Sequence, residues 1–382
     1  MNDFIYLRGL RKVDHTVFCV EDGQKYYWDQ QFGVRCAYSS GQQVKRSIID
    51  SILNDLREDP SPIYFNYEKS GNKINPKEAW SECDPSYTDQ LLGGWMKAKA
   101  RKKGKKKKDG EEDNSEKKEE THVIKRRSPF SISAMRPLHP LVGGLESNFE
   151  NMTFDRSNRP ERHQVLVREN DSPLSEEDVI KFLSENNLTL PKRIWVPGES
   201  QKNPGHGPGL RATGLFIYDI AIDLRTLFCI QTDQHEPELS IESIKQLKDK
   251  GWVERKNIFG KCLVCPQEKR IKIIDAIAYG LINWRITSNQ SRTFSLMETL
   301  AIAISNNANK LAYSIRAELS EKDERKAFPV IDFNSGTKLF VTPSASAHIA
   351  GIEYKHDALE KAEEEIKQTL LTFDYENQLA KV

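Results

Sequence analysis

The stretch RCAYSSGQQVKRSIIDSIL, Arg35 to Leu53, runs from a polar, serine-rich segment into a strongly patterned apolar run. Its apolar residues recur at the spacing of one helix face: Val44, Ile48, Ile49, Ile52, Leu53 and Leu56. Ser40 and Gln43 have the S-x-x-Q spacing of a capping box, in which both side chains bond free backbone N–H groups. The stretch therefore predicts a capped helix, which Pro60 stops.

A cap alone does not explain Lys45 and Arg46, because cations in the first turns of a helix are disfavoured by roughly 0.3–1 kcal/mol. They are favourable if an anion lies there, since free N–H groups, hydroxyls and cations together suit a phosphate. A nucleotide P-loop needs G-x-x-x-x-G-K-[ST], and only Gly41 is present. A plain cap and a phosphate contact remain the two interpretations, and the second is favoured.

Composition limits the classes of protein that fit this chain. Its 382 residues, 37% of them apolar, are enough for one large or two ordinary domains, and the net charge is +1. Residues 97–127 carry 14 basic and 7 acidic side chains, so the remainder is acidic by about six units. A uniformly basic nucleic-acid-binding protein is excluded, and any such function must rest on local patches.

The sequence favours a cytoplasmic location. MNDFIYLRGL lacks the basic and then apolar pattern of a secretory signal, and no run approaches the roughly 18 apolar residues of a membrane helix. Six cysteines in a chain of this length do not make a disulfide framework, which favours a reducing compartment. No membrane partner is expected.

Strand and helix patterns together predict an α+β fold. Residues 4–20 read as an extended strand, and GLFIYDIAIDLRTLFCI, from Gly214, has the density of a buried central strand. VIDF and KLFVTP are strand-like. Helices are predicted over Lys272–Trp284, Phe294–Asn306 and Asp357–Phe373.

Shifts in composition divide the chain into four parts. Residues 1–96 begin the core, 97–127 form a charged and disordered loop, 128–210 form an insertion, and 211–382 complete the core. The insertion carries a helix capped by Ser175 and arginines among aromatic residues: Arg136, Arg156, Arg159 and Arg162. Such a surface suits single-stranded nucleic acid, and a solvated extension is the alternative.

The opening stretch resembles the R…SSQ…KRAIR signature of the Cas-seven family, the backbone subunits of CRISPR Cascade complexes within the RAMP superfamily. The matching residues are Arg35, Ser39, Ser40, Gln42, Gln43, Lys45 and Arg46. The serines stand one residue farther from Lys-Arg than in the common motif, so either glutamine could fill the family position. GLFIYDIAIDL resembles the family's central strand, and TSNQSRTFSLMETL, Thr287 to Leu300, resembles its late polar loop and helix, with Ser291 and Arg292 in the loop.

This resemblance implies a modified RRM-like or ferredoxin-like antiparallel palm, a helical lobe, and a thumb-like β-hairpin from the insertion. It implies that copies of the chain stack along a CRISPR guide RNA in a type I complex. Further partners would be target DNA and other subunits such as a Cas-five-like cap. The expected RNA-binding residues are the seven motif residues with Arg136, Arg156, Arg159, Arg162, Ser291 and Arg292. No catalytic residue, cofactor or metal is expected.

Two other functions remain open at this point. An RNA-cleaving subunit of the same superfamily would use Asp14, Asp22 or Asp29, near the first strand–helix loop. A free-standing binder of single-stranded RNA would act as a monomer. Cys262 and Cys265 have zinc-ligand spacing, but a second pair would have to come from scattered residues, so they are interpreted as structural thiols.

Overall fold

A computed structural model gives the fold of the chain. It describes residues 3–18, 24–70, 73–97, 124–147, 153–155, 166–169, 172–190, 193–195, 210–233, 235, 238–286 and 294–380. The chain divides into two compact units. The first unit comprises residues 1–144 and 212–382, and the second comprises residues 145–211.

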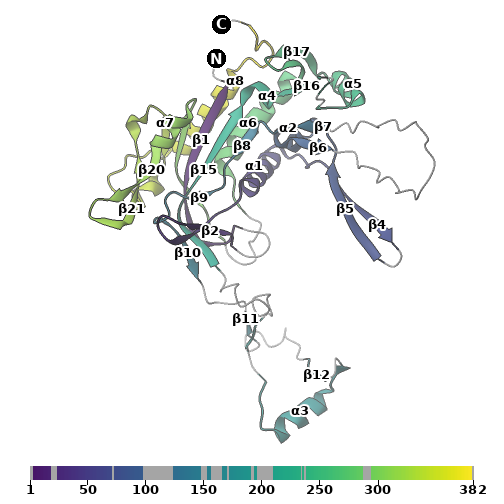
Figure 1. Ribbon diagram of the computed structural model, residues 1–382, viewed down its shortest axis with the longest axis vertical. Coiled ribbons are helices and arrows are strands. Elements are labelled where there is room, and N and C mark those ends of the chain that lie inside the picture. The colour runs from purple at the N-terminus through teal and green to yellow at the C-terminus, as the bar shows by residue number, and fades with distance from the viewer. Residues whose placement is uncertain are drawn as a thin grey trace, which may run out of the picture. The chain divides into compact units, whose positions relative to one another are not determined.

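A seven-stranded sheet forms the centre of the first unit (Figure 1). Its path runs β10-β15-β1-β19-β22, and β8 and β9 also pair with β15. The strands are β1 (Phe4–Thr16), β8 (Phe130–Ile132), β9 (Arg136–Pro137), β10 (Gly143–Ser147), β15 (Leu210–Asp223), β19 (Glu298–Ser305) and β22 (Lys338–Val341). Every pairing of β1, β8, β9, β19 and β22 within this sheet is antiparallel.

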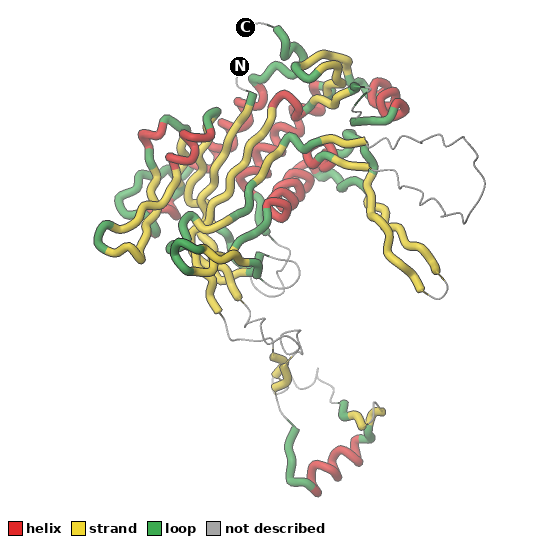
Figure 2. The backbone as a smooth tube through the Cα atoms, in the orientation of Figure 1, coloured by secondary structure: helices red, strands yellow, loops and turns green. Residues whose placement is uncertain are grey.

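Alternation along β1 assigns its side chains to the two faces of the sheet. Ile5 and Leu7 are buried on one face, while Tyr6 and Arg8 lie half-buried on the other. Three helices, α1 (Gly41–Leu56), α6 (Gln267–Asn283) and α8 (Ala358–Leu371), cover the first face (Figure 2).

Helices α1 and α6 pack closely because a glycine lies at their contact. A Cβ atom on Gly280 of α6 would come within 2.4 Å of the Ile52 side chain on α1. The apolar stripe predicted for α1 is buried there, with Val44, Ile48 and Ile52 fully covered.

A second, smaller core covers part of the opposite face. The short helix α7 (Ala308–Ser314) and the paired strands β20 (Ile315–Ser320) and β21 (Asp323–Ile331) contribute to it. Leu311, Ile315 and Ile331 pack there against Leu10 and Ile217 of the sheet. Beside α7, described residues of this face line a cavity.

Smaller elements complete the first unit. Two-stranded sheets join β2 (Tyr26–Asp29) to β3 (Val34–Ala37), β4 (Ile63–Ser70) to β5 (Lys73–Ser81), and β6 (Trp95–Lys97) to β7 (Ile124–Arg126). A three-stranded sheet has the order β16 (Cys229–Gln231), β18 (Gly260–Val264), β17 (Val253–Asn257). The short helices are α2 (Thr88–Gly93), α4 (Leu224–Leu227) and α5 (Ile241–Asp249), with 3₁₀ turns η3 (Phe333–Ser335) and η4 (Pro343–Ala347).

The second unit contains short strands and one helix. Its strands are β11 (Thr153–Asp155), paired with β14 (Arg193–Trp195), and β12 (Arg168–Glu169), paired with β13 (Ser172–Pro173). Helix α3 (Glu176–Glu185) begins at the predicted cap, where the Ser175 side chain accepts a hydrogen bond from the Asp178 N–H. No residue of α3 is buried.

The predicted α+β class with antiparallel sheets is confirmed, and so are α6 and α8 as helices. The helix predicted over Phe294–Asn306 is wrong, because this segment forms strand β19 between β1 and β22. Both faces of β19 are covered, so its apolar residues are continuous and do not alternate. Strands β8 and β9, from the segment predicted as an insertion, pair with β15 in the first unit.

Candidate nucleic-acid interface

The hairpin β2–β3 carries an exposed group of aromatic rings beside an arginine. Tyr26 and Trp28 are 44% and 57% exposed, and alternation places them on the same side of β2. Trp28 lies opposite Arg35 in the register, and the Arg35 guanidinium carbon is 5.1 Å from the Tyr26 ring centroid. Exposed rings next to a cation form a surface on which bases can stack.

Arg136 lies close to the other side of this hairpin. Strand β9, which carries Arg136, contacts β3. Burial raises the pKa of the Tyr27 phenol to about 12, the neighbouring Cys36 thiol adds to the rise, and the positive charge of Arg136 opposes it. The Arg136 side chain is 43% exposed, and its guanidinium lies 3.8 Å from a carboxylate oxygen of Asp219 on β15. We call Tyr26, Tyr27, Trp28, Arg35 and Arg136, which lie on the two sides of this hairpin, the arginine–aromatic surface.

The N-terminus of α1 adjoins this surface. Ser39 forms a β-bridge to Met135, the residue before Arg136, with N···O distances of 2.9 and 3.0 Å. Gly41 lies so close to β8 that a Cβ atom there would be 2.5 Å from the Ile132 carbonyl oxygen, which only glycine permits. The chain is thereby fixed where α1 begins.

The predicted capping role of Ser40 is confirmed. Its hydroxyl accepts a hydrogen bond of 3.3 Å from the Gln43 N–H. Gln42 is exposed to solvent, whereas Gln43 is partly covered.

Lys45 points away from the start of the helix. Its Nζ donates a hydrogen bond of 3.1 Å to the carbonyl oxygen of Gly93, at the C-terminal end of α2, where a cation complements the helix dipole. Burial lowers the pKa of Lys45 to about 8, and the charge of nearby Arg126 lowers it further. In this arrangement the amine serves the packing of α1 on α2.

The other two motif residues differ in exposure. Ser39 is only 1% exposed, and its hydroxyl has no hydrogen-bond partner among the described residues. A contact between Ser39 and RNA would require the bridge to Met135 to move. Arg46 is 59% exposed and forms an ion pair with Asp50, with a shortest N···O distance of 2.9 Å. It can reach an anion at the surface while remaining near that carboxylate.

Five of the sequence-predicted binding residues lie outside the described residues: Arg156, Arg159, Arg162, Ser291 and Arg292. Of the three aspartates considered for catalysis, Asp22 also lies outside them. Asp14 forms an ion pair with Lys12, and the Asp29 side chain accepts a hydrogen bond from the Phe32 N–H in the β2–β3 turn. Asp14 and Asp29 thus have local partners within the chain.

The described cysteines do not assemble a metal site. Cys265 is fully buried, and burial raises the pKa of its thiol to about 12. Cys262 instead lies near Cys229, on the paired strand β16. Within the described part of the chain, no three His, Cys, Asp or Glu side chains are placed to hold a metal ion.

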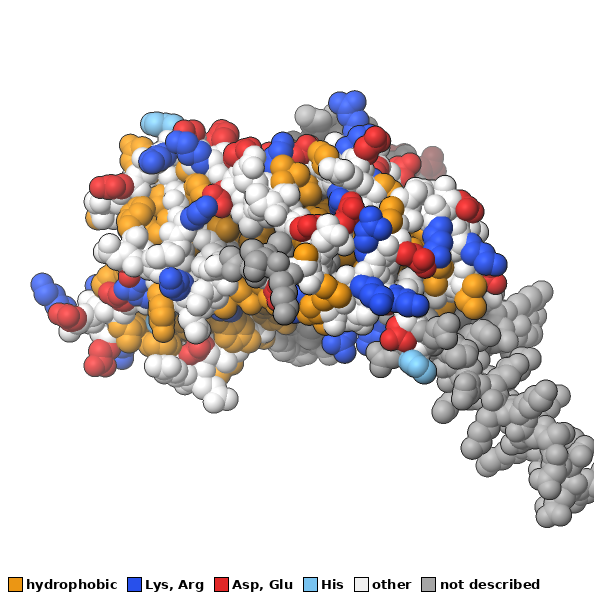
Figure 3. Space-filling model, turned by 90° about the horizontal axis from the view of Figure 1, so that it is seen from above, with side chains coloured by type: hydrophobic (Ala, Val, Ile, Leu, Met, Phe, Trp, Pro, Cys, Tyr) orange, Lys and Arg blue, Asp and Glu red, His pale blue; other side chains and the backbone are white. Residues whose placement is uncertain are grey.

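Sequence reasoning did not select the aromatic residues of the interface. Tyr26, Tyr27 and Trp28 form the run YYW directly before a turn, and that run is the signal that could have identified them. Charges of both signs are mixed on the face drawn in Figure 3. Local pairing of cations with rings therefore distinguishes the interface better than overall charge.

Comparison with solved structures gives weak likenesses in structure. One solved chain, titled "CRISPR RNA-guided surveillance complex", is 8% identical, with a TM-score of 0.34 over 96% of this chain and 84% of that chain. Another, titled "CRISPR RNA-guided surveillance complex, pre-nicking", is also 8% identical, with a TM-score of 0.38 over 96% and 89%. No family model matches the sequence, and no curated protein matches it. Separately, none of the helices in the described part of the chain is long and apolar enough to cross a membrane.

Proposed function

We propose that this chain is a guide-RNA-binding backbone subunit of a Cascade-like CRISPR complex, present in several copies and without enzymatic activity. In this proposal the central antiparallel sheet and its covering helices are the RRM-like palm. The second unit, together with the arginines outside the described residues, supplies the thumb-like contacts. The other partners would be target DNA and a Cas-five-like cap.

The arginine–aromatic surface beside the N-terminus of α1 is the observation that carries this proposal. The exposed rings of Tyr26 and Trp28 offer stacking, and Arg35 and Arg136 offer charge; neither contact depends on the identity of the base. Phosphate contacts position a nucleic acid but carry no sequence information. A subunit that must bind guides of arbitrary sequence needs this kind of surface.

Two residues of the serine–lysine motif, Ser39 and Lys45, are not available for phosphate contacts in this structure. Lys45 is held by Gly93 and Ser39 is buried, so the phosphate contacts fall mainly to Arg35, Arg46 and Arg136. Ser40 and Gln42 border the start of the helix, where a bound phosphate would meet its free N–H groups.

Salt dependence of guide binding tests this proposal. In the complex reconstituted with its partner subunits, the double substitution Arg35→Ala/Arg136→Ala should weaken binding of unrelated guides equally. Each lost phosphate contact should reduce the slope of log K against log salt by about 0.7 on a single strand. Lys245→Ala on α5, an exposed lysine outside the surface, is the matched control and should leave the slope unchanged.

A loss of binding that is confined to particular guide sequences would contradict binding through phosphate contacts.

The absence of enzymatic activity is tested on the same complex, incubated with magnesium and RNA complementary to the guide. Cleavage at regular intervals that is abolished by Asp14→Ala or Asp29→Ala would replace the proposal with a ribonuclease.

A further inference from the structure

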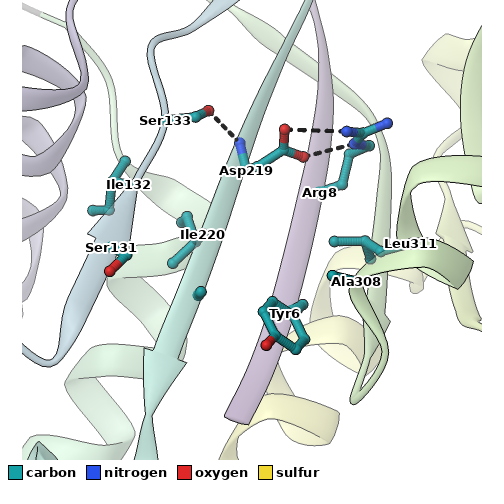
Figure 4. A pocket seen from close by; sticks show the side chains of 10 residues that line it. Tyr6, Arg8, Ser131, Ile132, Ser133, Asp219, Ile220, Ala308 and Leu311 are labelled. Carbon is teal, nitrogen blue, oxygen red and sulfur yellow. Dashed lines mark hydrogen bonds and ion pairs between the residues drawn. The ribbon is translucent and has the colours of Figure 1, made fainter.

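A cavity of about 420 Å³ lies on the open face of the central sheet, beside α7 (Figure 4). Its floor is formed by β1 and β15, where Tyr6 lies opposite Ala221 and Arg8 lies opposite Asp219. Ser131, the partner of Ala221 on β8, extends the floor. This volume falls in the range of roughly 300–1,000 Å³ that is typical of small-molecule sites.

Small side chains around one ring make the floor suited to a flat ligand. Tyr6 stands between Ala221 on one neighbouring strand and Ser305 on the other. Phe4 supports it from behind, with ring centroids 5.8 Å apart and planes at 17°. Leu311 and the exposed Ala308 of α7 line the opposite wall, so a planar group could lie between apolar side chains and the tyrosine ring.

The charged groups of the cavity are already paired with each other. The Arg8 guanidinium donates to both Asp219 oxygens, at 2.6 and 3.1 Å, and to the carbonyl oxygens of Ala312 and Ile315. Four of its five N–H groups are thus occupied. The Asp219 side chain keeps 30% exposure and unused lone pairs, whereas that of Arg8 keeps only 12%. The guanidinium of Arg136, which does not line the cavity, lies 3.8 Å from Asp219 Oδ2.

The cavity therefore offers a ligand a hydrogen-bond acceptor, the Asp219 carboxylate. The Ser133 hydroxyl, beside Asp219, already donates to the Ala134 carbonyl and accepts from the Asp219 N–H. A phosphate would meet the Asp219 carboxylate and find the Arg8 donors occupied. A ligand with an N–H group would instead complete the hydrogen bonding of Asp219.

We infer that this cavity binds a nucleobase that carries an exocyclic amino group. The base stacks on Tyr6, and its amino group donates a hydrogen bond to Asp219. The inference rests on the proposed function in one respect, which is that the base belongs to a nucleotide of bound RNA. The same cavity chemistry would also bind the base of a free nucleotide. Cytosine and uracil give the clearest comparison, because they differ at C4. Cytosine carries an amino group that can donate to the Asp219 carboxylate, whereas uracil carries a carbonyl oxygen that the carboxylate repels.

Binding of short oligonucleotides to the full chain tests this inference. Oligo(C) and oligo(U) of equal length, at one salt concentration, should differ by about tenfold in Kd in favour of oligo(C), as expected for one hydrogen bond to a charged acceptor. Ala221→Leu should fill the floor and remove the difference, leaving the salt slope unchanged. Ser131→Leu, at the exposed edge, gives a second blocking variant that does not disturb the sheet interior.

Two controls define the chemistry of the site. Tyr6→Phe keeps the ring and should keep the preference, whereas Asp219→Asn should abolish it. Because Asp219 also pairs with Arg136 of the arginine–aromatic surface, the measured quantity is the ratio of the two Kd values and not either Kd alone. Tyr354→Ala removes an exposed ring that does not line the cavity and should change nothing. Free CMP and UMP distinguish the sources, because a base site open to free nucleotides binds CMP more tightly, and a strand-only site binds neither.

The outcomes separate the two proposals. RNA binding with equal affinity for oligo(C) and oligo(U), or a preference that survives both blocking variants, overturns this inference and leaves the proposed function in place. A preference for cytosine in a chain that forms no multi-copy complex with guide RNA upholds the cavity and overturns the proposed function.

Discussion

Trp28 gives the most direct test of stacking at the proposed RNA interface. A tryptophan side chain offers roughly 150–250 Å². Because 57% of Trp28 is exposed, roughly 100 Å² is available, and a stacked base would cover about half of it. At 25 cal/mol per Å² this gives about 1–1.5 kcal/mol, at the low end of the range of about 1–3 kcal/mol measured for one base.

Trp28→Ala should therefore weaken binding of single-stranded RNA by about 5- to 12-fold per engaged copy. Trp28→Phe retains a stacking ring and should stay within about threefold of the wild-type chain. The assay is fluorescence anisotropy with labelled RNA at fixed salt, with thermal unfolding as the control for folding. Trp28→Ala binding as tightly as the wild type, while Arg35→Ala weakens binding strongly, would show that no base stacks on Trp28.

Two further predictions concern the packing behind the interface. Burial lowers the pKa of Lys45 from 10.5 to about 8, so between these two pH values the unfolded chain binds more protons than the folded chain. The free energy of unfolding should therefore rise with pH across this window. Lys45→Met should lose this rise, as measured by urea midpoints at pH 8 and 9.5. Arg11→Met should lower the free energy of unfolding by about 2–4 kcal/mol, because buried Arg11 donates to the Trp284 and Ile282 carbonyl oxygens at 2.8 and 3.2 Å. An unchanged urea midpoint would contradict the second prediction.

Local sequence signals predicted the elements that depend on near neighbours. The cap at Ser40 and the apolar stripe of α1 lie within one helix, and the structure contains both. The strand β15 was recognisable from its continuous β-branched and aromatic residues. These features follow from hydrogen bonds and periodicity over a few residues.

Features that depend on distant partners were not predictable in this way. The burial of Ser39 follows from its bridge to Met135, and the direction of Lys45 follows from the carbonyl of Gly93. The segment of β19 contains alanine and leucine, which suit a helix, and only its position between two strands makes it extended. Likewise, the pairing of Arg8 with Asp219 joins residues 211 positions apart.

The central claim is that several copies of this chain assemble on one guide RNA. Native mass spectrometry of the complex, reconstituted with its partner subunits and guides of two lengths, measures this directly. We expect one guide per particle, several copies of this chain, and a copy number that increases with guide length. A particle with a single copy at both lengths, or a chain that binds RNA stably only as a free monomer, would contradict it.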